Sequence, residues 1–77
     1  MNRGGGVHTV PSPVGSGWWN KVDGKVVSRH RLKDAAVETG REIARQLRVE
    51  HTIHLSDGTI GEKNSYGNDP YPPRDSR

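Results

Sequence analysis

The sequence predicts a small α+β domain in which one amphipathic helix packs on one face of a small antiparallel sheet. Three observations lead to this prediction: turn signals between β-prone runs, a single segment with helical periodicity, and the element order β-β-β-α-β-β. A chain of 77 residues has room for one domain. We place this domain at residues 7–71 and expect residues 1–6 and 72–77 to be flexible ends.

Three strands are expected before the helix. The first covers residues 7–10 and is followed by Pro11-Ser12-Pro13. Because proline has no N–H to donate to a strand ladder, this strand should end there or lie at a sheet edge. The other two, residues 17–22 and 25–29, flank Asp23-Gly24. Both turn residues tolerate the positive φ of a type I′ turn, so the pair predicts a hairpin.

Residues 32–48 change to the period of a helix. Small or apolar residues recur at helical spacing to form one stripe: Leu32, Ala36, Gly40, Ile43, Ala44 and Leu47. Gly40 lies on this stripe, where it costs about 1 kcal/mol relative to alanine, so we expect the helix backbone to approach the sheet closely there. No Ser, Thr, Asp or Asn directly precedes the helix, and its first turn should fray or be capped from elsewhere.

A second hairpin is expected after the helix. Residues 49–55 read as a strand that places Val49, His51, Ile53 and Leu55 on one face, and residues 59–63 begin the return strand. Between them, Ser56-Asp57-Gly58 is a turn signal. Beyond the return strand we interpret residues 66–70 as a structural clasp. In this clasp the Tyr66 ring closes the core and four turn residues reverse the chain: Gly67, Asn68, Asp69 and Pro70.

Several of these segments together carry a family resemblance. They are Gly17-Trp18, the helical Gly40-Arg41-Glu42-Ile43-Ala44, Val49-Glu50-His51-Thr52-Ile53-His54, Asp57-Gly58, and Glu62-Lys63-Asn64-Ser65-Tyr66-Gly67-Asn68-Asp69-Pro70. The pattern resembles the small bacterial and phage family catalogued as domain of unknown function 2188, over about residues 7–73. This resemblance implies a compact α+β domain with no known activity and no agreed catalytic residues. Members of that family usually have Thr at the start of the helix, where this chain has Leu32.

The sequence shows no pattern typical of a catalytic or metal site. His8, His30, His51 and His54 are the candidates, but His51 and His54 point to opposite faces of a strand and cannot form a joint metal site. The chain has no cysteine, which removes thiolate ligands. We therefore expect no enzyme activity, no catalytic or metal-binding residues, no cofactor and no small-molecule substrate.

The N-terminus lacks the apolar region of a secretory signal, and no run approaches the ~20 apolar residues of a membrane span. These observations predict a cytoplasmic protein that does not bind membranes.

Basic residues are concentrated in the first two thirds of the chain. Residues 1–48 carry nine Lys/Arg and four Asp/Glu, a net +5, whereas residues 49–77 carry three and five, a net −2. This asymmetry permits a polyanionic partner. The candidate nucleic-acid contacts are the hairpin residues Lys21, Lys25, Arg29 and Arg31 and the helix residues Arg41, Arg45 and Arg48. Glu38 and Glu42 partly neutralise the helix face.

The first expectation for function is a non-enzymatic accessory protein that acts as a protein-interaction module, such as an adaptor, an inhibitor or a homodimer. The apolar share is only 29%, so a partner could supply missing burial. Candidate contacts are Trp18, Trp19 and Tyr71. The two tryptophans are adjacent, so one can enter the core while the other stays outside, and the sequence does not say which. Nucleic-acid binding through the basic helix face and hairpin is the alternative.

Overall fold

The computed structural model describes residues 6–66, and the structural statements below refer to that range. It contains five strands and one helix in the order β1 (Val7–Pro11), β2 (Trp18–Val22), β3 (Lys25–His30), α1 (Lys33–Leu47), β4 (Glu50–His54) and β5 (Ile60–Ser65). The predicted order β-β-β-α-β-β is therefore confirmed. The predicted clasp residues Gly67 to Pro70, and Tyr71, lie outside the described residues, while Tyr66 is half-buried just after β5.

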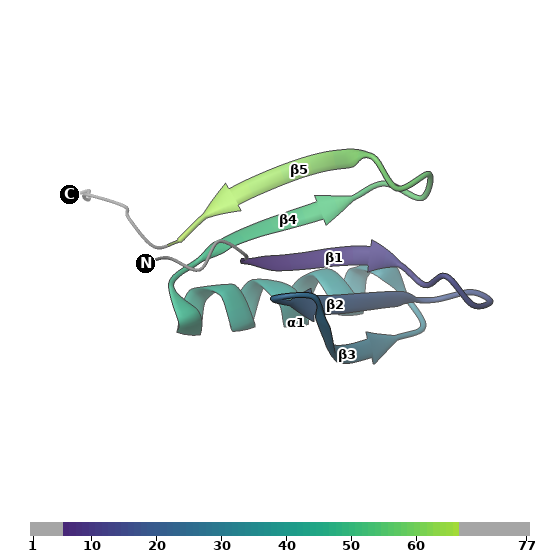
Figure 1. The fold of residues 1–77 in the computed structure, drawn as a ribbon, viewed down its shortest axis with the longest axis horizontal. Helices are drawn as coiled ribbons and strands as arrows, with labels where there is room; N and C mark the ends of the chain where they lie inside the picture. The colour runs from purple at the N-terminus through teal and green to yellow at the C-terminus, as the bar shows by residue number, and fades with distance from the viewer. Residues whose placement is uncertain (1–5, 67–77) are drawn as a thin grey trace.

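The strands form one sheet in the order β3-β2-β1-β4-β5 (Figure 1). Three neighbouring pairs are antiparallel, but β1 and β4 run parallel, so the sheet is mixed and mostly antiparallel. The parallel pair arises because the chain crosses over through α1 before it returns beside β1. Strand β1 ends at Pro11, as the prolines indicated, yet it is the central strand of the sheet and not an edge strand.

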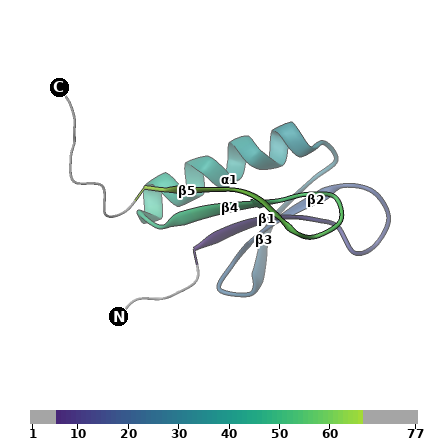
Figure 2. The ribbon, with the colours of Figure 1, turned by 90° about the horizontal axis from the view of Figure 1, so that it is seen from above.

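Helix α1 covers one face of the sheet, and within residues 6–66 no second layer covers the other face (Figure 2). The buried apolar side chains are Val7, Ala36, Ala44 and Ile53. Four polar residues are buried as well: Thr9, Asn20, His51 and Thr52. The core is thus as poor in apolar residues as the composition indicated. We call the face that α1 covers the helix face and the opposite one the open face.

The two residues at the ends of the predicted apolar stripe, Leu32 and Leu47, are exposed in the structure, so the prediction was wrong there. Ala36, Gly40 and Ala44 are buried, whereas Leu32 is 63% and Leu47 is 52% exposed. Leu32 has extended backbone angles and precedes the first helical turn, so it does not lie on the helical stripe. Leu47 is the last helical residue. Similarly, Leu55 follows the end of β4 and is 43% exposed, although alternation placed it with His51 and Ile53.

The local turn prediction agrees with the structure. Asp23 and Gly24 have φ values of 54° and 81°, as the type I′ hairpin between β2 and β3 requires. No side chain caps the start of α1 at Leu32. In the described part of the chain, no helix is long and apolar enough to cross a membrane.

Candidate functional site

The β2–β3 hairpin carries an aromatic ring and basic groups on the open face. Asn20 contacts α1, so its strand neighbours Trp19 and Lys21 point to the open face. Arg29 lies opposite Trp19 on β3, with its Cζ atom 5.4 Å from the centre of the Trp19 ring. This distance is within the range of a cation–π interaction. The arrangement holds a guanidinium group and an indole ring next to each other on a rigid hairpin.

The second tryptophan has a cation of its own on the other side of β2. Trp18 lies on the helix face, where the Lys33 Nζ atom is 5.2 Å from the ring centre. Both tryptophans are half-buried. The prediction that they occupy opposite faces is consistent with this arrangement, but neither ring enters the core completely. Each ring therefore keeps part of its surface accessible.

Positive charge is concentrated in this part of the molecule. Residues 18–33 contain five bases and one acid, so their net charge is 5 − 1 = +4. Residues 34–66 contain four bases and six acids, a net charge of 4 − 6 = −2. Two ion pairs form among the described residues, Arg41 with Glu38 and Lys63 with Glu50, and neither involves a base of residues 18–33. The five bases are Lys21, Lys25, Arg29, Arg31 and Lys33. We call residues 18–33 the basic hairpin segment.

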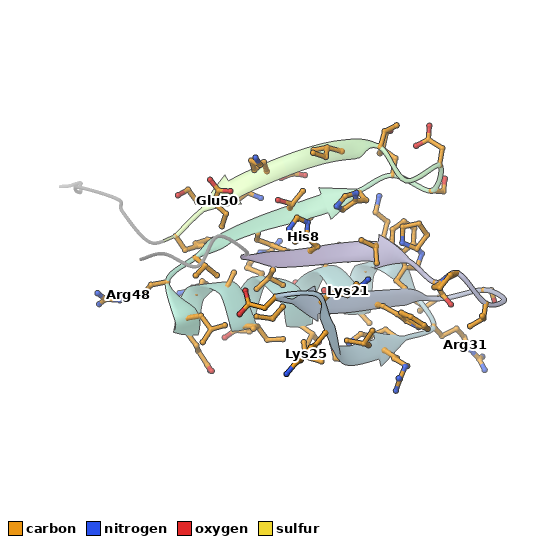
Figure 3. The ribbon with its side chains drawn as sticks, in the orientation of Figure 1. His8, Lys21, Lys25, Arg31, Arg48 and Glu50 are labelled. Carbon is orange, nitrogen blue, oxygen red and sulfur yellow. The ribbon has the colours of Figure 1, made fainter. Side chains whose placement is uncertain are left out.

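The structure does not bring the helix arginines to the basic hairpin segment. Arg41 pairs with Glu38 on the helix surface, with 3.3 Å between Nη1 and Oε2. Arg48 ends the helix at the opposite end of the molecule from Arg31 (Figure 3). Lys21 and Arg29 therefore lie on a different surface from the helix arginines. Lys21 and Arg29 point away from the helix that carries Arg41, Arg45 and Arg48.

A second feature is a chain of buried polar side chains between the sheet and α1. The Thr9 hydroxyl donates to Asn20 Oδ1 at 2.6 Å and lies 2.7 Å from His51 Nε2. The amide nitrogen of Asn20 donates to Ser28 Oγ at 3.0 Å and to the Ala36 carbonyl of α1 at 2.9 Å. The network thus connects β4, β1, β2 and β3 to the helix. Because its centre is fully buried, we assign it a structural role.

The hydrogen bonds determine which nitrogen of His51 carries the proton. The single hydroxyl proton of Thr9 is donated to Asn20 Oδ1, so His51 must donate its Nε2–H to the Thr9 oxygen. His51 Nδ1 is buried and has no hydrogen-bond partner within residues 6–66. Burial lowers the pKa of His51, and the nearby Arg41 charge lowers the pKa further. The imidazole is therefore neutral in the folded protein near pH 7.

This lowered pKa predicts that acid destabilises the fold. The unfolded chain takes up a proton at His51 as the pH falls below 6.5, while the folded chain resists protonation. The contribution of neutral His51 to the free energy of unfolding is complete above pH 6.5. It is lost as the pH falls below this value, by up to about 1.4 kcal/mol per pH unit. Urea denaturation at several pH values should show this slope in the wild type. The slope should shrink in His51→Gln and persist in the control His30→Gln; equal slopes in all three would contradict the assignment.

Sequence reasoning missed a second histidine pair. His54 was compared with His51, but its structural neighbour is His8, which is 46 positions away in the sequence. The two lie on adjacent parallel strands, β1 and β4, on the open face. No sequence signal could identify the pair, because His8 and His54 come close together only through the crossover that pairs β1 with β4. Among the described residues there is no group of three or more potential metal ligands.

The comparison with protein families agrees with the resemblance seen in the sequence. The family model described as "Uncharacterized protein conserved in bacteria (DUF2188)" matches residues 7–66, which include all five strands and the helix. No curated protein and no solved structure matches the chain. The chain therefore belongs to the bacterial family of domain of unknown function 2188.

Proposed function

We propose that this protein binds nucleic acid in the cytoplasm through its basic hairpin segment. The observation that supports the proposal best is the net charge of +4 on residues 18–33, which no ion pair within the described residues offsets. Lysine and arginine side chains that contact phosphates release condensed counterions, which favours binding to any nucleic acid. A protein partner was the first expectation from the sequence, but the separation of charge favours a polyanion.

Trp19 adds a second element of recognition. Its half-buried ring lies on the open face beside Arg29, at 5.4 Å. A tryptophan in a basic surface can stack on an unpaired base, and such stacking contributes about 1–3 kcal/mol per base. The proposal therefore includes a preference for single-stranded over duplex nucleic acid. Lys21 (Figure 3) lies on the same strand as Trp19, two residues further along the chain. The hairpin turn begins two residues after Lys21, at Asp23.

Fluorescence anisotropy with labelled single-stranded and duplex DNA and RNA tests this proposal. Phosphate contacts by Lys21 and Arg29 on the open face would together contribute about −1.4 to the slope of log K against log salt for a single strand, at about −0.7 per contact. The double variant Lys21→Glu/Arg29→Glu should weaken binding at least about tenfold and reduce this slope by about 1.4, because two contacts are lost. Trp19→Leu should weaken single-strand binding more than duplex binding.

The matched control is Arg45→Glu/Arg48→Glu, which changes the net charge by the same amount on the helix surface. This control should bind nearly as tightly as the wild type. If both double variants lose affinity equally, the interaction depends on net charge and not on the hairpin. Absence of any binding at low salt would remove the proposal.

A protein-interaction role is the second candidate, and the two edge strands favour it. Val27 on β3 is 49% exposed and Ile60 on β5 is 58% exposed. Exposed apolar residues on edge strands can promote pairing with another strand, including one from a second copy. Light scattering distinguishes the candidates, because association that resists salt and disappears in Val27→Lys or Ile60→Lys indicates a protein contact.

A further inference from the structure

Two histidine rings on the open face lie at the separation expected of metal ligands. His8 Nδ1 and His54 Nε2 are 3.2 Å apart, and their ring centres are 5.5 Å apart. Zinc binds histidine nitrogen at about 2.0–2.1 Å, so two ligands at the tetrahedral angle are separated by about 3.3 Å. The observed separation is close to this value. The rings are also tilted by 43° relative to each other, so their faces do not stack in parallel.

The backbone fixes the proton position that metal binding by His54 requires. His54 Nδ1 lies 2.9 Å from the Gly58 carbonyl oxygen. A carbonyl only accepts, so Nδ1 carries the proton and Nε2 presents a lone pair toward His8. Most metal-binding histidines donate their second ring N–H to a carbonyl or carboxylate in this way, which fixes the tautomer and the orientation of the ring. Gly58 lies in the loop that joins β4 to β5, so the hairpin itself supplies this support.

The two rings are also held on rigid elements. His8 lies on β1, the central strand of the sheet, and its register partners are Lys21 on β2 and Thr52 on β4 (Figure 3). His54 is the last residue of β4. Both rings are half-buried on the face that α1 does not cover. A site on paired strands keeps its ligands in place before the metal arrives, and an uncovered face allows the metal to enter.

We propose that His8 Nδ1 and His54 Nε2 together bind a divalent zinc-like metal ion. The metal takes the place of the proton that His8 Nδ1 shares with His54 Nε2, and His8 then carries its ring proton on Nε2. Within residues 6–66 no third His, Cys, Asp or Glu groups with this pair, so the described residues supply two ligands. With two protein ligands, the dissociation constant for Zn²⁺ should be roughly 1–100 μM, well above that of four-ligand structural sites.

Isothermal titration calorimetry of the untagged full chain with Zn²⁺ tests the proposal. The wild type should bind one Zn²⁺ ion in the stated range. His8→Ala and His54→Ala should each weaken binding at least about tenfold, because loss of a supporting residue alone costs about 10–100-fold. The double variant should be no weaker than either single variant, since chelation needs both rings. The matched control His30→Ala removes a half-buried histidine of β3 and should bind as the wild type does.

A second measurement avoids any effect of the substitutions on folding. Imidazole NMR signals of the wild type, recorded during the Zn²⁺ titration, should shift for His8 and His54 and stay in place for His30 and His51. Shifts at His30 or His51, or unchanged affinity in both single variants, would overturn the proposal. Absence of Zn²⁺ binding in the stated range would also overturn it and leave the pair as a hydrogen bond between strands. None of these outcomes bears on nucleic-acid binding by the basic hairpin segment.

Discussion

Gly40→Ala is expected to destabilise the fold by about 2–4 kcal/mol, although alanine is the better helix former by about 1 kcal/mol. A Cβ atom at this position would lie 2.6 Å from Asn20 Oδ1, 2.6 Å from His51 Nε2 and 2.8 Å from Thr9 Oγ1. These distances are shorter than real Cβ contacts allow, so at least one side chain would have to move. All three are buried, and Thr9 is hydrogen-bonded to both Asn20 and His51, so movement would break bonds that water cannot replace.

Urea denaturation followed by circular dichroism measures this change. Glu42→Ala is the control, because it introduces the same residue at an exposed position two residues further along the helix. It should change stability by no more than a few tenths of a kcal/mol. If Gly40→Ala is as stable as the wild type or more stable, the helix does not approach the sheet as closely as the structure shows.

Gly40 shows which features of the fold can be predicted from the sequence and which cannot. A glycine on the buried side of a helix predicted a close approach of the backbone to the sheet, and the structure confirms the approach. The sequence did not indicate that the atoms beneath it are polar. Thr9, Asn20 and His51 come from three strands, and their contact depends on the order in which those strands pair. Local patterns predict which face a residue occupies, but not which residue lies next to it across the sheet.

Because local patterns do not predict neighbours across the sheet, the sheet topology was only partly predictable. The hairpin at Asp23-Gly24 was predictable because a two-residue turn specifies its own backbone conformation. The parallel pairing of β1 with β4 has no local signal, since the crossover between them includes two strands and the helix. For this reason the sequence predicted an antiparallel sheet with β1 at an edge or ending at the prolines. The His8–His54 pair was missed for the same reason.

The basic hairpin segment was partly predictable. Lys21, Lys25, Arg29 and Arg31 were candidates from composition alone, and period-2 alternation placed Trp18 and Trp19 on opposite faces. The sequence also grouped the helix arginines with these residues, because both sets are basic. The structure separates Lys21 and Arg29 from the helix arginines, because these two side chains point away from the face that α1 covers. Figure 2 shows α1 on one face of the sheet. Charge counts along a chain do not show which surface each charge occupies.

Thr9→Val is expected to cost about 2–4 kcal/mol of folding stability, although valine has nearly the same shape and favours strands. The hydroxyl of Thr9 donates to Asn20 Oδ1 and accepts from His51 Nε2, at 2.6 Å and 2.7 Å. Valine leaves both groups without a partner in a fully buried site. An unsatisfied buried donor or acceptor costs about 1–3 kcal/mol. Urea denaturation at pH 7 to 8, where His51 is neutral, measures the loss without a contribution from protonation.

Thr52→Val is a close control for this prediction because it makes the same substitution on the neighbouring strand. Thr52 is 3% exposed, but its side chain takes no part in the hydrogen-bond network that joins Thr9, Asn20 and His51. Its replacement should leave stability within about 0.5 kcal/mol of the wild type, since no buried polar group loses a partner. Equal losses in the two variants would mean that the cost comes from the apolar methyl group in a tight sheet. A large loss in Thr9→Val alone would show that a hydrogen-bonded hydroxyl, held under a helix glycine, specifies how this thin core packs.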